Sequence, residues 1–95
     1  MHGAMNAIRK CNSAFIETDV DDEVVIVSLE DGQFFSLKET GHSIWKKIDG
    51  ARDRNAILQE LEAEFDAASE VLARDLDAFL AQVSAAGFIE GNGRN

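Results

Sequence analysis

Residue types that carry catalysis or bind metals are few in this chain, and they are scattered. His2 and His42 are far apart in the sequence, and Cys11 has no second cysteine with which to form a C-x-x-C pair. Zinc sites need several such ligands at close spacing, so no metal site is expected. The serines stand in no glycine-rich elbow and the glycines form no phosphate loop. The sequence therefore predicts a protein without a catalytic residue, a metal or a cofactor.

The composition limits the partners of the chain. Its 95 residues, 45% of them hydrophobic, are enough for one domain with a modest core. Nine Lys and Arg against 18 Asp and Glu give a formal net charge of −9, which repels nucleic-acid phosphates and anionic lipids. No apolar run approaches the roughly 18 residues of a membrane helix, and the single Cys11 cannot form an internal disulfide. We expect a cytoplasmic protein that binds neither nucleic acid nor membranes.

The first half of the chain has the pattern of an antiparallel sheet. Strands are expected over residues 15–18, 24–29 and 34–37, the second of which is rich in valine and isoleucine, whose branching at Cβ suits a pleated backbone. Asp31-Gly32 predicts the hairpin turn between the last two strands, because glycine tolerates positive φ and aspartate can bond its own backbone. Residues 1–14 show no sustained period and are expected to form a flexible tail.

The third strand carries the main functional hypothesis. Alternation places Phe35 and Leu37 on the core side and Phe34 and Ser36 on the opposite side. If no later strand pairs beyond residues 34–37, the outer rim of this strand keeps free N–H and C=O groups. Another extended chain can then form hydrogen bonds with these groups, so this rim is a candidate docking edge.

The second half of the chain changes to helical periodicity. We expect a first helix capped by Thr40, a second from the N-cap Asp53 to Asp66, and a third capped near Ser69 and running to Ala86, with residues 91–95 as a disordered tail. The predicted fold class is α+β, a three-stranded antiparallel sheet followed by three helices.

The third predicted helix has two stripes. The first is apolar and should form the core, and it contains Leu72, Leu76, Phe79, Leu80 and Val83. The second, parallel stripe contains Val71, Asp75, Ala78 and Gln82, and it can wall a groove that receives a guest chain. The alternative is that its apolar members are ordinary boundary positions of the core, and periodicity alone leaves both interpretations open.

The pattern V-x-I-V-x-L-x-D-G-x-F-F-x-L-x-x-T-G-x-x-I-W-x-x-I-D-G resembles that of the PqqD-like proteins. The resemblance covers residues 15–90 and includes Asp31-Gly32, Ile44-Trp45 and the late segment Gly87-Phe88-Ile89. It implies a winged helix-turn-helix-like domain that recognises the leader segment of a ribosomally made, later modified precursor peptide. The aromatic hairpin is more similar to the stand-alone members of lasso-peptide pathways than to the pyrroloquinoline-quinone member.

The resemblance also implies which residues hold the leader. The guest is expected to pair as an extra antiparallel strand with Phe34, Phe35, Ser36, Leu37 and Lys38 and to lie against Val71, Asp75, Ala78, Phe79 and Gln82. Asp75 is the expected contact for a polar or basic leader residue. The implied role is delivery of the peptide to a modifying enzyme or a leader peptidase, with no catalysis by this chain.

Two other classes of protein are alternatives to a leader-binding role. A winged-helix DNA-binding regulator shares the topology, but its recognition helix should carry basic residues. Residues 53–66 hold one basic residue, Arg54, among several acidic ones. A carrier domain with a prosthetic arm would need an Asp-Ser-Leu-like attachment site, and the sequence contains none.

Overall fold

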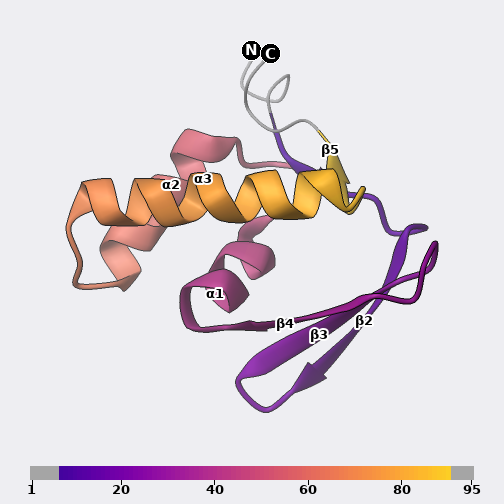
Figure 1. Ribbon diagram of the computed structural model, residues 1–95. Coiled ribbons are helices and arrows are strands. Elements are labelled where there is room, and N and C mark those ends of the chain that lie inside the picture. Colours follow the sequence, from indigo (N-terminus) through magenta and orange to yellow (C-terminus); the bar gives the residue numbers. More distant parts are fainter. Residues whose placement is uncertain (1–6, 91–95) are drawn as a thin grey trace.

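The predicted fold class is confirmed by the structure, a computed structural model that describes residues 7–90. Strands β2 (Phe15–Val20), β3 (Glu23–Ser28) and β4 (Phe34–Lys38) form an antiparallel sheet in that order. Helices α1 (Glu39–Lys47), α2 (Arg54–Glu64) and α3 (Ser69–Ala85) follow, and they all lie on one side of the sheet (Figure 1). Two further strands, β1 (Arg9–Lys10) and β5 (Ile89–Glu90), pair with each other.

The hairpin between β3 and β4 forms where the sequence predicts it. Gly32 has a φ of +76°, a left-handed conformation that glycine adopts without steric cost. Asp31 accepts a hydrogen bond from the Gln33 N–H through its side chain at 3.2 Å, and the Gly32 N–H donates to the Ser28 carbonyl at 2.9 Å. These bonds fix the pairing of β4 with β3.

An aromatic row ties the sheet to the helices. The Phe15 ring meets both Trp45 of α1 and Phe88 edge to face, with ring centroids 5.3 Å apart in each pair. Phe88 in turn meets Phe35 of β4 at the same distance. Trp45 and Phe88 are fully buried. Burial of these large rings, and of the predicted α3 core stripe, supplies much of the hydrophobic stabilisation of the fold.

The expectation of a flexible tail over residues 1–14 is wrong for residues 7–14. Ile8 is fully buried, its N–H donates to the Arg52 carbonyl at 2.9 Å, and its carbonyl accepts from Gly50 at 3.0 Å. Cys11 donates to the Phe88 carbonyl, next to the β1–β5 pair. Long-range backbone bonds therefore hold this segment, although it has no local period. Residues 1–6 and the tail predicted over 91–95 lie outside the described residues.

Two of the three predicted helix caps differ from the structure. Asp53 caps α2 as expected, accepting from the Ala56 N–H at 2.9 Å. Thr40 does not cap α1, because the helix already begins at Glu39, where a φ of +53° turns the chain directly out of β4. Ser69 is the first residue of α3 and not its cap, since Ala68 occupies that position. The absence of a loop after Lys38 brings the start of α1 against the end of β4.

Candidate functional site

Strand β4 has an open edge. It pairs with β3 on one side, and no other strand of residues 7–90 pairs with its far side. The strand edge that was expected to stay unpaired is therefore open in the described chain. In Figure 1 this edge runs below α3, with the start of α1 at one end.

The backbone groups that β4 leaves unpaired follow from the register. The Ser28 N–H donates to the Gln33 carbonyl at 2.7 Å, so these two residues form a hydrogen-bonded pair. Such pairs alternate along an antiparallel ladder, and Phe35 and Leu37 therefore direct their N–H and C=O groups to β3. Phe34, Ser36 and Lys38 direct theirs away from the sheet. These three residues present the donors and acceptors of the open edge.

A hollow of about 270 Å³ lies between α1 and α3, beside the point where β4 passes into α1. Its α3 wall is formed by Asp75, Ala78, Phe79 and Gln82. Its α1 wall is formed by Thr40, Gly41 and Ile44. The ring of Phe79 is largely buried and forms an apolar surface, whereas Asp75 and Gln82 are exposed polar residues. The hollow can therefore take a side chain with an apolar body and a polar end.

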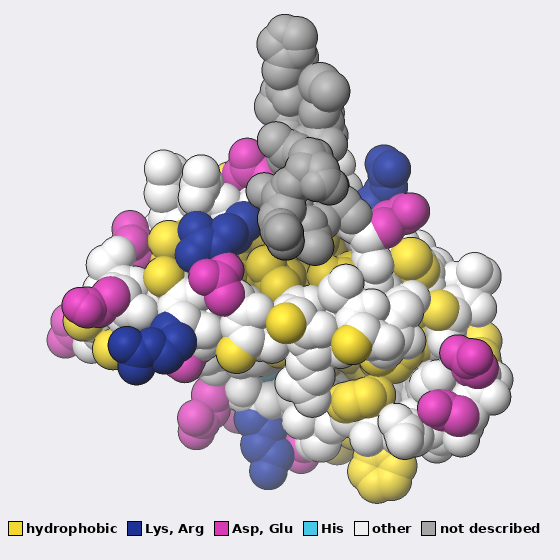
Figure 2. Space-filling view, turned by 45° about the horizontal axis from the view of Figure 1, so that its top comes forward, with side chains coloured by type: hydrophobic (Ala, Val, Ile, Leu, Met, Phe, Trp, Pro, Cys, Tyr) yellow, Lys and Arg dark blue, Asp and Glu magenta, His cyan; other side chains and the backbone are white. Residues whose placement is uncertain are grey.

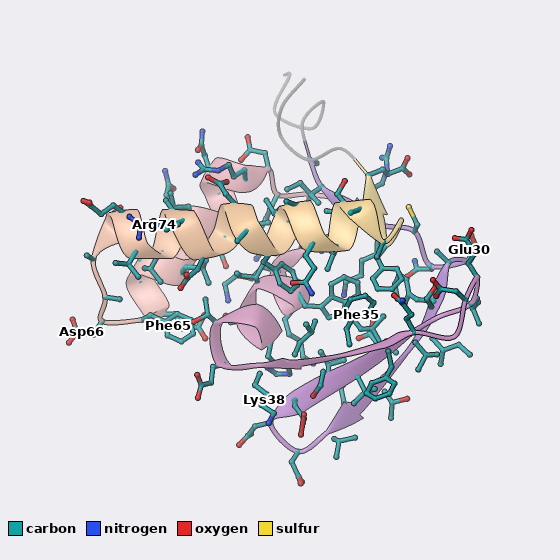
Figure 3. The ribbon with its side chains drawn as sticks, in the orientation of Figure 1. Glu30, Phe35, Lys38, Phe65, Asp66 and Arg74 are labelled. Carbon is teal, nitrogen blue, oxygen red and sulfur yellow. The ribbon has the colours of Figure 1, made fainter. Side chains whose placement is uncertain are left out.

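The structure brings together most, but not all, of the residues predicted to form the site. The four α3 residues at the hollow were all predicted, whereas Val71 does not line it and is 44% exposed near the start of α3. On β4, Phe35 and Leu37 face the helices, as expected. Figure 3 shows Phe35 between β4 and α3 and Lys38 on the opposite side of the strand. Phe34 and Ser36 share the side of Lys38, because side chains alternate along a strand.

Thr40, Gly41 and Ile44 line the hollow, although the sequence pattern does not predict them there. Gly41 is the one of the three that the sequence could have indicated. A glycine inside a helix lowers helix stability by about 1 kcal/mol relative to alanine, so its presence there often has a packing or functional reason. A Cβ atom at this position would lie 3.7 Å from the Phe79 ring, an ordinary contact. Glycine is thus not required to avoid a clash, and its effect is to leave the hollow wider.

Ion pairs link α2 to each of the two helices that frame the hollow. Arg54 of α2 donates to both carboxylate oxygens of Asp77 on α3, at 2.6 and 3.0 Å, and these bonds hold the pKa of Asp77 below its usual value. Lys47 of α1 donates to Glu64 of α2 at 2.7 Å, which lowers the pKa of that carboxyl. Asp75, in contrast, takes part in none of the salt bridges formed within residues 7–90. Its charge at the rim of the hollow is therefore available to a guest.

The described residues provide no cluster of three or more His, Cys, Asp or Glu side chains able to hold a metal ion. Across residues 7–90, helices of the length and apolar character needed to cross a membrane are absent.

Fold and site together define a small α+β domain with an open sheet edge beside a helix-lined hollow, an arrangement that favours the binding of an extended peptide. The model of the family described as Coenzyme PQQ synthesis protein D matches residues 23–89, and the chain belongs to this PqqD family. A solved structure of TbiB1 in complex with the TbiA(beta) leader peptide is similar, with 29% sequence identity and a TM-score of 0.74. That match covers 82% of this chain and 91% of TbiB1. No curated protein matches the chain.

Proposed function

We propose that this protein binds the leader segment of a ribosomally made precursor peptide as an added strand and delivers it to a modifying enzyme or leader peptidase of the same pathway. The observation that carries the proposal is the open β4 edge running up to the hollow between α1 and α3. Membership of the PqqD family and the similarity to leader-bound TbiB1 support it. The role is recognition, with no chemical step assigned to this chain.

The register of β4 gives the expected arrangement of the guest. Its backbone would pair with the N–H and C=O groups of Phe34, Ser36 and Lys38, which point away from β3. Guest residues opposite Phe35 and Leu37 would direct their side chains toward the helices and the hollow, because facing residues share a side of the sheet. Backbone bonds would thus hold any extended peptide, and the hollow would select among sequences.

The contacts in the hollow suggest the selected side chain. Phe79 and Ala78 offer apolar surface, Gln82 can donate or accept, and the Asp75 carboxylate favours a basic or hydrogen-bond-donating group. Val71 would be reached only by a guest that extends past the hollow toward the start of α3.

Titration of the purified protein with the leader half of a precursor encoded beside its gene tests the proposal. Fluorescence anisotropy of the labelled peptide should show saturable binding with a Kd below about 100 μM. A scrambled peptide of the same composition should bind at least about tenfold more weakly, a difference of about 1.4 kcal/mol. Failure of the native leader to saturate in this range would contradict the proposal.

The DNA-binding alternative has no comparable support. Arg54, the one basic residue of α2, is paired with Asp77, and the other charged residues of this helix are glutamates. A recognition helix of this kind would repel the phosphate backbone.

A further inference from the structure

The face of the sheet opposite the helices carries an apolar row that crosses all three strands. Ile16 of β2 lies opposite Val27 of β3, and Val27 lies opposite Phe34 of β4. Ile16 is 56% exposed, Phe34 is 71% exposed, and Val27 between them is half-buried. Side chains directly opposite one another on neighbouring strands are in contact distance, so these three form one continuous surface.

This row is more than the scattered apolar exposure of an ordinary surface. Five large apolar side chains are exposed in the described chain, and three of them, Ile16, Val20 and Phe34, stand on this face of the sheet. In Figure 2 the outer face of the sheet is turned away from the reader, but an apolar side chain projects at the lower margin, on the side where the sheet lies. A contiguous exposed patch on a small, highly charged protein is typical of an interaction surface.

Acidic residues lie at both ends of this face. The turn that follows β3 contains Glu30 and Asp31, and the turn that precedes β3 contains Asp21 and Asp22. At the end formed by the turn before β3, the surface has a depression of about 360 Å³. This depression is lined by Val20, Asp21, Asp22, Glu23, Lys38 and Glu39. A complementary partner would therefore present apolar side chains between lysine or arginine side chains.

The apolar row is continuous with the leader-binding edge. Phe34 is the last member of the row and also presents its backbone to the open side of β4. A leader paired with β4 would place one side chain next to Phe34 on this same face, and it would extend the row by one strand. A protein that docks here would contact the recognition protein and its bound peptide together.

From this continuity and from the charge pattern, we propose that the outer face of the β2–β3–β4 sheet, centred on Ile16, Val27 and Phe34, docks the enzyme that acts on the captured peptide. The occupant is a folded protein with an apolar patch bordered by basic residues. The inference rests on the proposed leader-binding function. It assigns the enzyme a surface separate from the hollow between α1 and α3.

The test uses the purified modifying enzyme or leader peptidase encoded beside the gene, with the protein loaded with leader. In Ile16→Glu the substitution lies two strands away from the open edge, so the leader Kd should stay within about twofold, whereas binding of the enzyme should weaken by at least about tenfold. The control Ala81→Glu adds the same charge on an exposed position of α3 and should change neither affinity. The milder Ile16→Ser should weaken enzyme binding in the same direction.

The outcomes separate the two proposals. If the leader does not bind the wild-type protein, the proposed function fails. If the leader binds but the enzyme binds Ile16→Glu and Ile16→Ser as tightly as wild type, or does not bind the loaded protein at all, the docking surface is wrong. Sedimentation of the wild-type protein as a dimer that Ile16→Glu dissociates would also overturn it, because a second copy would then occupy this face.

Discussion

Phe34 and Phe35 are adjacent in β4, yet their rings lie on opposite faces of the sheet. The Phe35 ring packs edge to face against Phe88, with centroids 5.3 Å apart, whereas Phe34 is 71% exposed. Of the two aromatic residues, only Phe35 contributes to the buried core, and only Phe34 is exposed to a protein approaching the outer face.

This difference predicts unequal effects on stability. Phe35→Ala should lower the free energy of unfolding by about 2 to 3 kcal/mol, somewhat below the usual loss for a fully buried phenylalanine, because Phe35 is only partly buried. Phe34→Ala should change it by no more than about 0.5 kcal/mol. Urea denaturation followed by circular dichroism measures both values, and equal losses would contradict the assignment of faces.

A large side chain at Ala78 should block the leader. Ala78 is exposed and lines the hollow, so Ala78→Trp should fill the space without disturbing the core and weaken leader binding by at least about tenfold. The matched control is Ala81→Trp, which adds the same ring to an exposed position of α3 that does not line the hollow. Anisotropy titration of both variants checks the prediction, and similar affinities would remove the hollow from the binding site.

Proline scanning should distinguish the two edges of β4. Proline lacks an N–H, and Ser36 directs its N–H outward, so Ser36→Pro should leave the pairing with β3 intact and weaken leader binding. Leu37→Pro removes a bond to β3 as well as a buried side chain, and it should unfold the protein at a lower temperature than Ser36→Pro. Thermal melts and leader titrations test the pair. Undiminished leader binding by Ser36→Pro would show that the guest does not use this edge.

The contact between Lys47 and Glu64 predicts a small pH dependence. Hydrogen bonds from Lys47 and then from Ser43 lower the pKa of Glu64 in the folded protein, so the stabilisation is present above the ordinary value of 4.5 and is lost as the pH falls through the folded value. Since the Glu64 side chain is 46% exposed, the effect at pH 7 should be at most about 0.5 kcal/mol. Wild type should exceed Glu64→Gln in stability at pH 7, and the difference should shrink when the measurement is repeated at a pH well below 4.5. A constant difference across urea titrations at both pH values would contradict this account.

Local chemistry predicts much of the fold. Branching at Cβ in β3, the left-handed Gly32 and the side-chain cap at Asp53 act over a few residues, and the structure confirms the hairpin and the start of α2 where these signals occur. The buried stripe of α3 is equally visible, because its period is set by the helix itself.

Features that depend on distant partners are not predictable in this way. Ile8 is held by backbone bonds to Arg52 and Gly50, and no property of its neighbours in sequence indicates them. Periodicity predicts the stripe from Val71 to Gln82. Which part of this stripe lines the hollow depends on where Gly41 and the rest of α1 pack against α3. The sequence therefore indicates the residues of the groove more reliably than its extent.

The pairing of β1 with β5 has a practical consequence for engineering. Arg9 lies opposite Glu90, so the chain enters and leaves the described fold at neighbouring points, which lie at the upper part of Figure 1, whereas β4 runs toward the bottom. A catalytic domain from another protein can accordingly be fused to either terminus without covering the strand that would receive the peptide. Joining the two ends through a short linker and opening the chain at the Asp21-Asp22 turn should likewise give a permuted protein with the same exposed edge.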